Sequence, residues 1–132
     1  MNTVARLRET PRRAAVALGY ALVVLVASIV PTPPGSLAPM GPLGLVGLDK
    51  WVHAAGYAGL GLVFASAVRA RERKEVVGAV VVAAAFGTGI ELVQAVLPYR
   101  SFGVADAGAN LLGAVVGGAL WVAVAWVAEP RR

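Results

Sequence analysis

Four long apolar segments limit the folds that are open to this sequence. They cover residues 14–30, 51–68, 76–97 and 108–128. A helix that crosses a bilayer needs about 20 mostly apolar residues, with about 17 as the lower limit. Backbone groups in hydrocarbon have no water to bond, so a segment that crosses must be helical. The sequence therefore predicts an all-α, polytopic membrane protein with four transmembrane helices.

The composition leaves little polar surface for a soluble domain. Charged residues make up 14% of the 132 residues and hydrophobic residues 58%, whereas a soluble domain carries about 25% charged residues. We therefore expect one membrane domain, residues 14–128. Cysteine is absent, which excludes disulfides, cysteine zinc sites and cysteine nucleophiles.

The basic residues lie mainly on one side of this domain. All except Lys50 and Arg100 precede the first segment, fill the link between the second and third, or follow the fourth. These three groups are Arg6, Arg8, Arg12 and Arg13; Arg69, Arg71, Arg73 and Lys74; and Arg131 and Arg132. Lys and Arg are enriched in cytoplasmic loops, so we expect both termini, residues 1–13 and 129–132, in the cytoplasm. The orientation in the membrane then accounts for the net charge of +5, and we expect no nucleic-acid partner.

The connections between the segments differ in character. The first segment follows a basic stretch, as a secretory signal would, but "PTPPG" follows it without a convincing cleavage site, so we expect a retained helix. The short link "RARERKE" predicts an antiparallel hairpin of the second and third helices. Residues 31–48 hold five prolines and four glycines and cannot form a regular helix. We expect this loop to lie on the membrane surface or to cover the outer mouth of the bundle.

Polar side chains recur at helical spacing near the outer end of three segments. The three sets are Asp49, His53 and Tyr57; Glu91 and Gln94; and Asp106 and Asn110. Spacings of three and four residues put each set on one helix face. With about 1.5 Å of rise per residue, all three sets lie at a similar depth. Three helices with polar faces at one level predict a shared site, with Arg100 in the adjacent loop and Lys50 one position off the Asp49 face as a headgroup contact.

Each residue also has a plain structural interpretation. Asp49 and Asp106 stand near helix N-termini, where a carboxylate suits the macrodipole. His53 could be an ordinary buried histidine or an interface anchor, Tyr57 could serve packing, and Asn110 could join two helices.

Glu91 is the residue that a purely structural interpretation explains least well. It lies inside a predicted span and near a helix C-terminus, where the dipole disfavours an anion. Ionisable residues within membranes are costly and point to function. Glu91 needs a proton or a partner, and the sequence offers Arg100, Lys50 and His53 as partners on the outer side. We therefore favour a functional site over a structural polar network.

The same polar residues carry a family resemblance. "DKWVHAAGYAGLG" is followed by "ELVQAVLPYRSFGVADAGANLLGAVVGG", in the pattern D-K-x-x-H-x-x-x-Y-x-x-L, E-x-x-Q, P-x-R and D-x-x-x-N-x-x-G-x-x-x-G. Over residues 49–117 the chain resembles the VanZ-like family of small bacterial membrane proteins. The resemblance implies a multi-pass protein of the bacterial cell membrane. The family is named after a protein associated with low-level teicoplanin resistance, and it has no agreed reaction that could be carried over.

Three functions fit these residues. An enzyme could act on a cell-envelope or lipid-linked substrate by acid–base chemistry, with Glu91, His53 and Asp106 as catalytic candidates. The candidates for substrate binding are Asp49, Lys50, Tyr57, Gln94, Arg100 and Asn110. A non-catalytic protein that binds a lipid or drug, or an oligomeric transport subunit, would use the same polar residues. One histidine with scattered carboxylates is a weak metal signal, so we expect no metal or cofactor, and membrane lipids and a lipid-linked or cell-wall ligand as partners.

Overall fold

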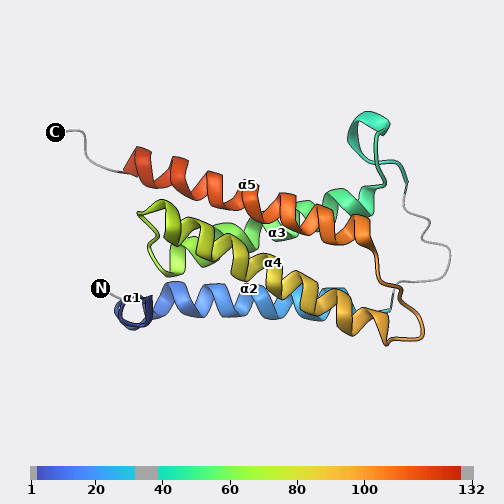
Figure 1. Cartoon of the computed structure of the whole chain (residues 1–132), viewed down its shortest axis with the longest axis horizontal. Helices are drawn as coiled ribbons and strands as arrows, with labels where there is room; N and C mark the ends of the chain where they lie inside the picture. Colours follow the sequence, from blue (N-terminus) through green and yellow to red (C-terminus); the bar gives the residue numbers. More distant parts are fainter. Residues whose placement is uncertain (1–2, 32–38, 129–132) are drawn as a thin grey trace.

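The computed structural model describes residues 3–31 and 39–128, and they form an all-α fold, as predicted (Figure 1). The helices are α1 (Thr3–Glu9), α2 (Pro11–Ile29), α3 (Leu48–Ala67), α4 (Arg73–Ala95) and α5 (Val104–Ala128), with a short 3₁₀ turn, η1 (Pro42–Gly44), before α3. Each long helix begins about three residues before its predicted segment. The predicted segments start later because they contain only the apolar residues, whereas the first turn of each helix also holds polar residues or proline. The helix α1 was not predicted, since it is only seven residues long.

Three of the described helices are long and apolar enough to cross a membrane: α2, α4 and α5. These helices establish the chain as a multi-pass membrane protein. The helix α3 is not among these three, and its first turns carry Asp49, Lys50 and His53. That α3 also crosses the membrane stays a prediction.

The four long helices run antiparallel in sequence order and form one bundle, with α1 and the end of α5 at the same end (Figure 1). The helix α3 lies at the centre and contacts α2, α4 and α5. Its contact with α5 is very close, because a Cβ atom at Gly113 or Gly117 would overlap a backbone carbonyl oxygen of α3, at Ala54 or Ala58. Small residues let helix backbones approach in this way in membrane proteins.

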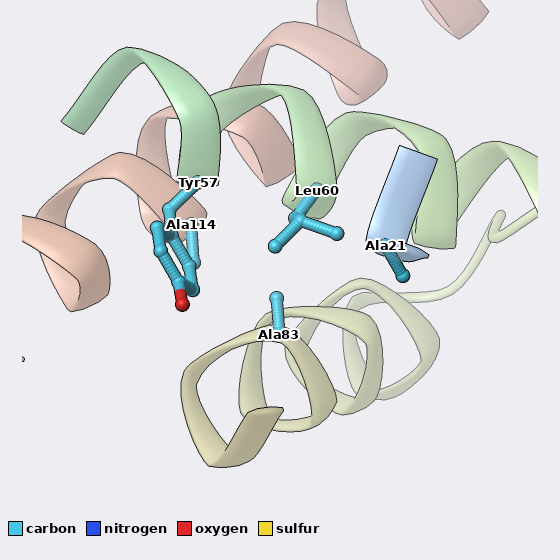
Figure 2. Packing of buried hydrophobic residues seen from close by; sticks show 5 residues of the cluster. All are labelled: Ala21, Tyr57, Leu60, Ala83 and Ala114. Carbon is cyan, nitrogen blue, oxygen red and sulfur yellow. The ribbon is translucent and has the colours of Figure 1, made fainter. Parts of the chain in front are cut away.

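The core of the bundle is built mainly from alanine. Figure 2 shows Leu60 of α3 facing Ala83 of α4, while the ring of Tyr57 lies beside Ala114 of α5. Ala21 brings α2 into the same cluster. Lipid is as apolar as leucine, so helices in a membrane associate through close packing and polar contacts rather than through hydrophobic burial. A core of small side chains suits that environment.

Backbone hydrogen bonds define the turn before α3 and the turn after it. At its C-terminus, the N–H groups of Arg69 and Ala70 bond back to Ser66 and Ala65, with Arg69 in the left-handed region at φ 48°. Five residues then lead to α4, so the predicted hairpin link is confirmed. Before α3, the N–H of Gly41 bonds to the carbonyl of Val46, which closes a tight turn. Residues 32–38 of the predicted surface loop lie outside the described residues.

Candidate functional site

The predicted polar residues gather at one end of the bundle, where α3 and α5 begin and α2 and α4 end. The first turns of α3 and α5 contain Asp49 and Asp106, whose carboxylates suit the positive end of each helix dipole. Each carboxylate lies over the glycine that precedes its helix, because a Cβ atom at Gly47 or Gly103 would overlap it. The helix starts therefore explain why acidic side chains stand at this end.

A hydrogen-bonded chain connects three helices at the centre of this site. The Nδ1 of His53 in α3 lies 3.0 Å from the amide oxygen of Asn110 in α5. The amide nitrogen of Asn110 donates to Glu91 of α4 over a longer 3.5 Å. The other carboxylate oxygen of Glu91 accepts from the backbone N–H of Gly103 at 3.3 Å. Because the amide oxygen of Asn110 only accepts, His53 donates through Nδ1.

Glu91 is fully buried, with 0% of its surface exposed. Arg100, Lys50 and His53, which the sequence offered as its partners, do not pair with it in the described part of the chain, and its contacts are Asn110 and Gly103 instead. The sequence predicted a proton or a partner for Glu91, and its contacts with Asn110 and Gly103 were not among the partners considered. Helical spacing identifies which face carries Glu91, but not which neighbour that face meets.

Lys50 forms a second polar cluster between α3 and α5. Its ammonium pairs with Asp49 in the same helix and with Asp106 at 2.5 Å. All three side chains are partly exposed, between 21% and 41%. Lys50 is therefore an ion-pair bridge between two helix starts. The carboxylate–histidine set considered for a metal does not converge, since Asp49 and Asp106 lie with Lys50 and Glu91 with Asn110.

Three side chains from α4 and the loop after it bind consecutive backbone carbonyls at the end of α2. The donor–acceptor pairs are Gln94 with Ser28 at 2.7 Å, Tyr99 with Ile29 at 3.0 Å, and Arg100 with Val30 at 2.8 Å. Carbonyls at a helix C-terminus have no partner within the helix and attract cations. Gln94 and Arg100, which the sequence suggests for ligand binding, thus also hold α2 against α4.

Tyr57 lies deeper, below the hydrogen-bonded chain. Its side chain is 3% exposed and packs on Gly87 of α4, where a Cβ atom would overlap the ring. The Tyr57 hydroxyl has no hydrogen-bond partner among the described residues. A buried hydroxyl without a partner costs free energy of folding.

An open pocket of about 440 Å³ lies beside these groups. The predicted residues His53, Gln94, Arg100 and Asp106 line it, together with loop residues next to Arg100. The Nε of Arg100 is buried and has no partner among the described residues. The pocket therefore brings a histidine, a guanidinium and a carboxylate to one wall, with Glu91 and Asn110 buried behind His53.

Three loop residues of this pocket were not predicted as site residues: Pro98, Tyr99 and Ser101. Tyr99 binds α2, and Ser101 lines the pocket beside Arg100. Both flank an arginine that the sequence singled out, so the "PYRS" stretch as a whole was the available signal. The contribution of the α2 carbonyls had no sequence signal, because a backbone acceptor is the same for every residue type.

The sequence model of one protein family, described as VanZ/LLP1, matches residues 36–126. The match covers α3 and α4 completely and α5 up to Trp126, and it includes every residue that the sequence predicted for the site. Comparisons with curated proteins and with solved structures find no significant match.

Proposed function

This chain belongs to the VanZ/LLP1 family, and from that premise we propose that it binds the anionic part of a cell-envelope or lipid-linked substrate in the polar pocket. We place the pocket at the outer face of a bacterial cell membrane. The chain would cross that membrane four times, with both termini in the cytoplasm. Two features support this topology: the central position of α3 among three apolar helices, and the basic residues at the end of the bundle opposite the pocket.

The observation that carries the proposal is the guanidinium of Arg100 in the lining of the pocket. Arg100 uses one terminal nitrogen for the Val30 carbonyl, and a guanidinium has five N–H donors in all. The remaining donors suit a phosphate or carboxylate, which arginine binds with paired hydrogen bonds. Gln94 and His53 line the same pocket and add further hydrogen-bonding groups.

The hydrogen-bonded chain behind the pocket supports acid–base chemistry by His53. A neutral imidazole that donates through Nδ1 keeps its lone pair on Nε2. Such a nitrogen can accept a proton from a bound hydroxyl or water. Glu91 is fully buried and lies behind Asn110, so we assign it as a positioning residue that acts through Asn110 rather than as a group that touches substrate.

A non-catalytic binding protein is the alternative. The hydrogen bonds from Gln94 and Arg100 to α2 favour it. Residues that hold two helices together can still bind a ligand with their remaining N–H donors. In that case the pocket would hold a lipid headgroup or a glycopeptide such as teicoplanin without turning it over. An oligomeric transport subunit is a further alternative that the antiparallel four-helix arrangement leaves open.

Profiling of lipid-linked cell-wall precursors in a deletion strain tests the proposal. We expect the deletion to change the precursor profile and the wild-type gene to restore it. If the protein is an enzyme, Glu91→Gln should abolish restoration, since it removes the carboxylate behind Asn110. A binding protein should tolerate Glu91→Gln better than Arg100→Ala. Each variant must insert and accumulate like the wild type, as measured by immunoblot of membranes.

The matched controls lie at the opposite end of the bundle. Glu72→Gln and Arg73→Ala make the same changes at exposed positions next to the α4 start, and both should restore the profile fully. Normal restoration by Arg100→Ala, Glu91→Gln and His53→Ala together would show that the cluster is structural only.

A further inference from the structure

A second pocket lies between α2 and α3, at the end of the bundle opposite the polar pocket. Its volume is about 160 Å³, and its lining residues are Arg12, Arg13, Val16, Val63 and Ser66. None of these residues belongs to the proposed outer site. The pocket combines two arginines with an apolar wall.

Arg13 holds a fixed positive charge at the rim of this pocket. Its guanidinium donates to the side-chain oxygen of Ser66 at 3.1 Å and to the Ser66 carbonyl at 3.4 Å. The same guanidinium lies 5.8 Å from the ring centroid of Trp121, within the range of a cation–π contact. These contacts from α3 and α5 orient Arg13 before any ligand arrives.

Arg12 adds a second positive charge to the lining of this pocket. Among the described residues no hydrogen bond or ion pair is found for Arg12, and the first turn of α2 contains no acidic residue. By contrast, nearby Arg6 is already paired with Glu75. The rim of the pocket therefore attracts an anion.

The inner wall of the pocket is apolar. Val16 lies one helical turn beyond Arg12 in α2, about 6 Å further along the helix, and 61% of it is exposed. Val63 faces it from α3. A soluble anion would use only the arginines, whereas an amphiphile with an anionic head would also cover the two valines.

We propose that this groove binds an anionic phospholipid of the inner leaflet, with its phosphate at Arg12 and Arg13 and an acyl chain along Val16 and Val63. Charge complementarity carries the choice of ligand. Basic pockets between membrane helices on the cytoplasmic side bind anionic headgroups, and each surface arginine adds attraction to an anionic leaflet. This inference concerns the other end of the bundle and stands whether or not the outer pocket binds a substrate.

Lipid titration of the purified full chain tests the inference. Thermal unfolding in detergent should shift upward with added dioleoylphosphatidylglycerol and much less with dioleoylphosphatidylcholine. In Arg12→Gln, the apparent affinity for phosphatidylglycerol should fall about fivefold, the ratio expected for one surface arginine. Arg12 is the better test residue because its side chain makes no bond that the fold needs.

Arg73→Gln is the matched control, since Arg73 is an exposed arginine at the same end of the bundle but outside the groove. It should keep the wild-type affinity. An equal loss in Arg73→Gln would overturn the inference in favour of unspecific attraction. Equal stabilisation by phosphatidylcholine, or by inorganic phosphate alone, would overturn it as well.

Discussion

Asn110 is the residue on which the inner part of the candidate site depends. One amide in α5 contacts His53 of α3 and Glu91 of α4, and the Asn110 side chain is 2% exposed. The orientation of His53 and the burial of Glu91 therefore follow from a single side chain.

We expect Asn110→Ala to destabilise the protein by about 1–3 kcal/mol, because it leaves buried polar groups of both neighbours without a partner. Unfolding in mixed detergent micelles, followed by tryptophan fluorescence, measures the change. Thr88→Ala serves as control, since this exposed hydroxyl bonds only to its own helix, and it should be nearly neutral. Wild-type stability in Asn110→Ala would mean that the hydrogen-bonded chain does not exist in the protein.

At the scale of the elements, the contact between α3 and α5 holds the site together. Gly117 has no room for a Cβ atom, because the carbonyl oxygen of Ala58 lies there. Gly108, in the same helix, has no neighbouring heavy atom within 4 Å of an added Cβ atom. An alanine at Gly117 therefore tests the close packing of α3 on α5, whereas an alanine at Gly108 changes only the helix propensity of α5.

Gly117→Ala should destabilise the bundle by about 1–3 kcal/mol, as overpacking does, and it should also weaken the alignment of His53 with Asn110. Gly108→Ala should be neutral or stabilising by up to about 1 kcal/mol, since alanine favours helix. The same unfolding measurement compares the two variants. Equal effects would contradict the close approach of α3 and α5.

Much of this arrangement could be predicted from the sequence, and the reasons are physical. Apolar length identified α2, α4 and α5, and helical spacing identified the faces that carry His53 and Asn110. Spacing along one helix contains no information about the helix opposite, so the contacts of Glu91 with Asn110 and Gly103 were not predicted. The bonds from Gln94 and Arg100 to α2 were missed because their acceptors are backbone carbonyls.

At the scale of the whole molecule, the bundle has two chemically different ends. One end holds the polar pocket with His53 and Arg100, and the other holds the groove with Arg12 and Arg13. Each site would meet the headgroup region of a different leaflet if the bundle spans the membrane. The proposed function therefore depends on the polar pocket opening to the outer side.

Cysteine labelling in intact cells tests this central claim most directly, because the natural sequence contains no cysteine. Ser101→Cys introduces a thiol at the polar pocket, and Glu72→Cys introduces one at the exposed link before α4. A membrane-impermeant maleimide should label Ser101→Cys in intact cells and Glu72→Cys only after lysis. Labelling of Glu72→Cys in intact cells, with Ser101→Cys labelled only after lysis, would contradict an outward-facing site.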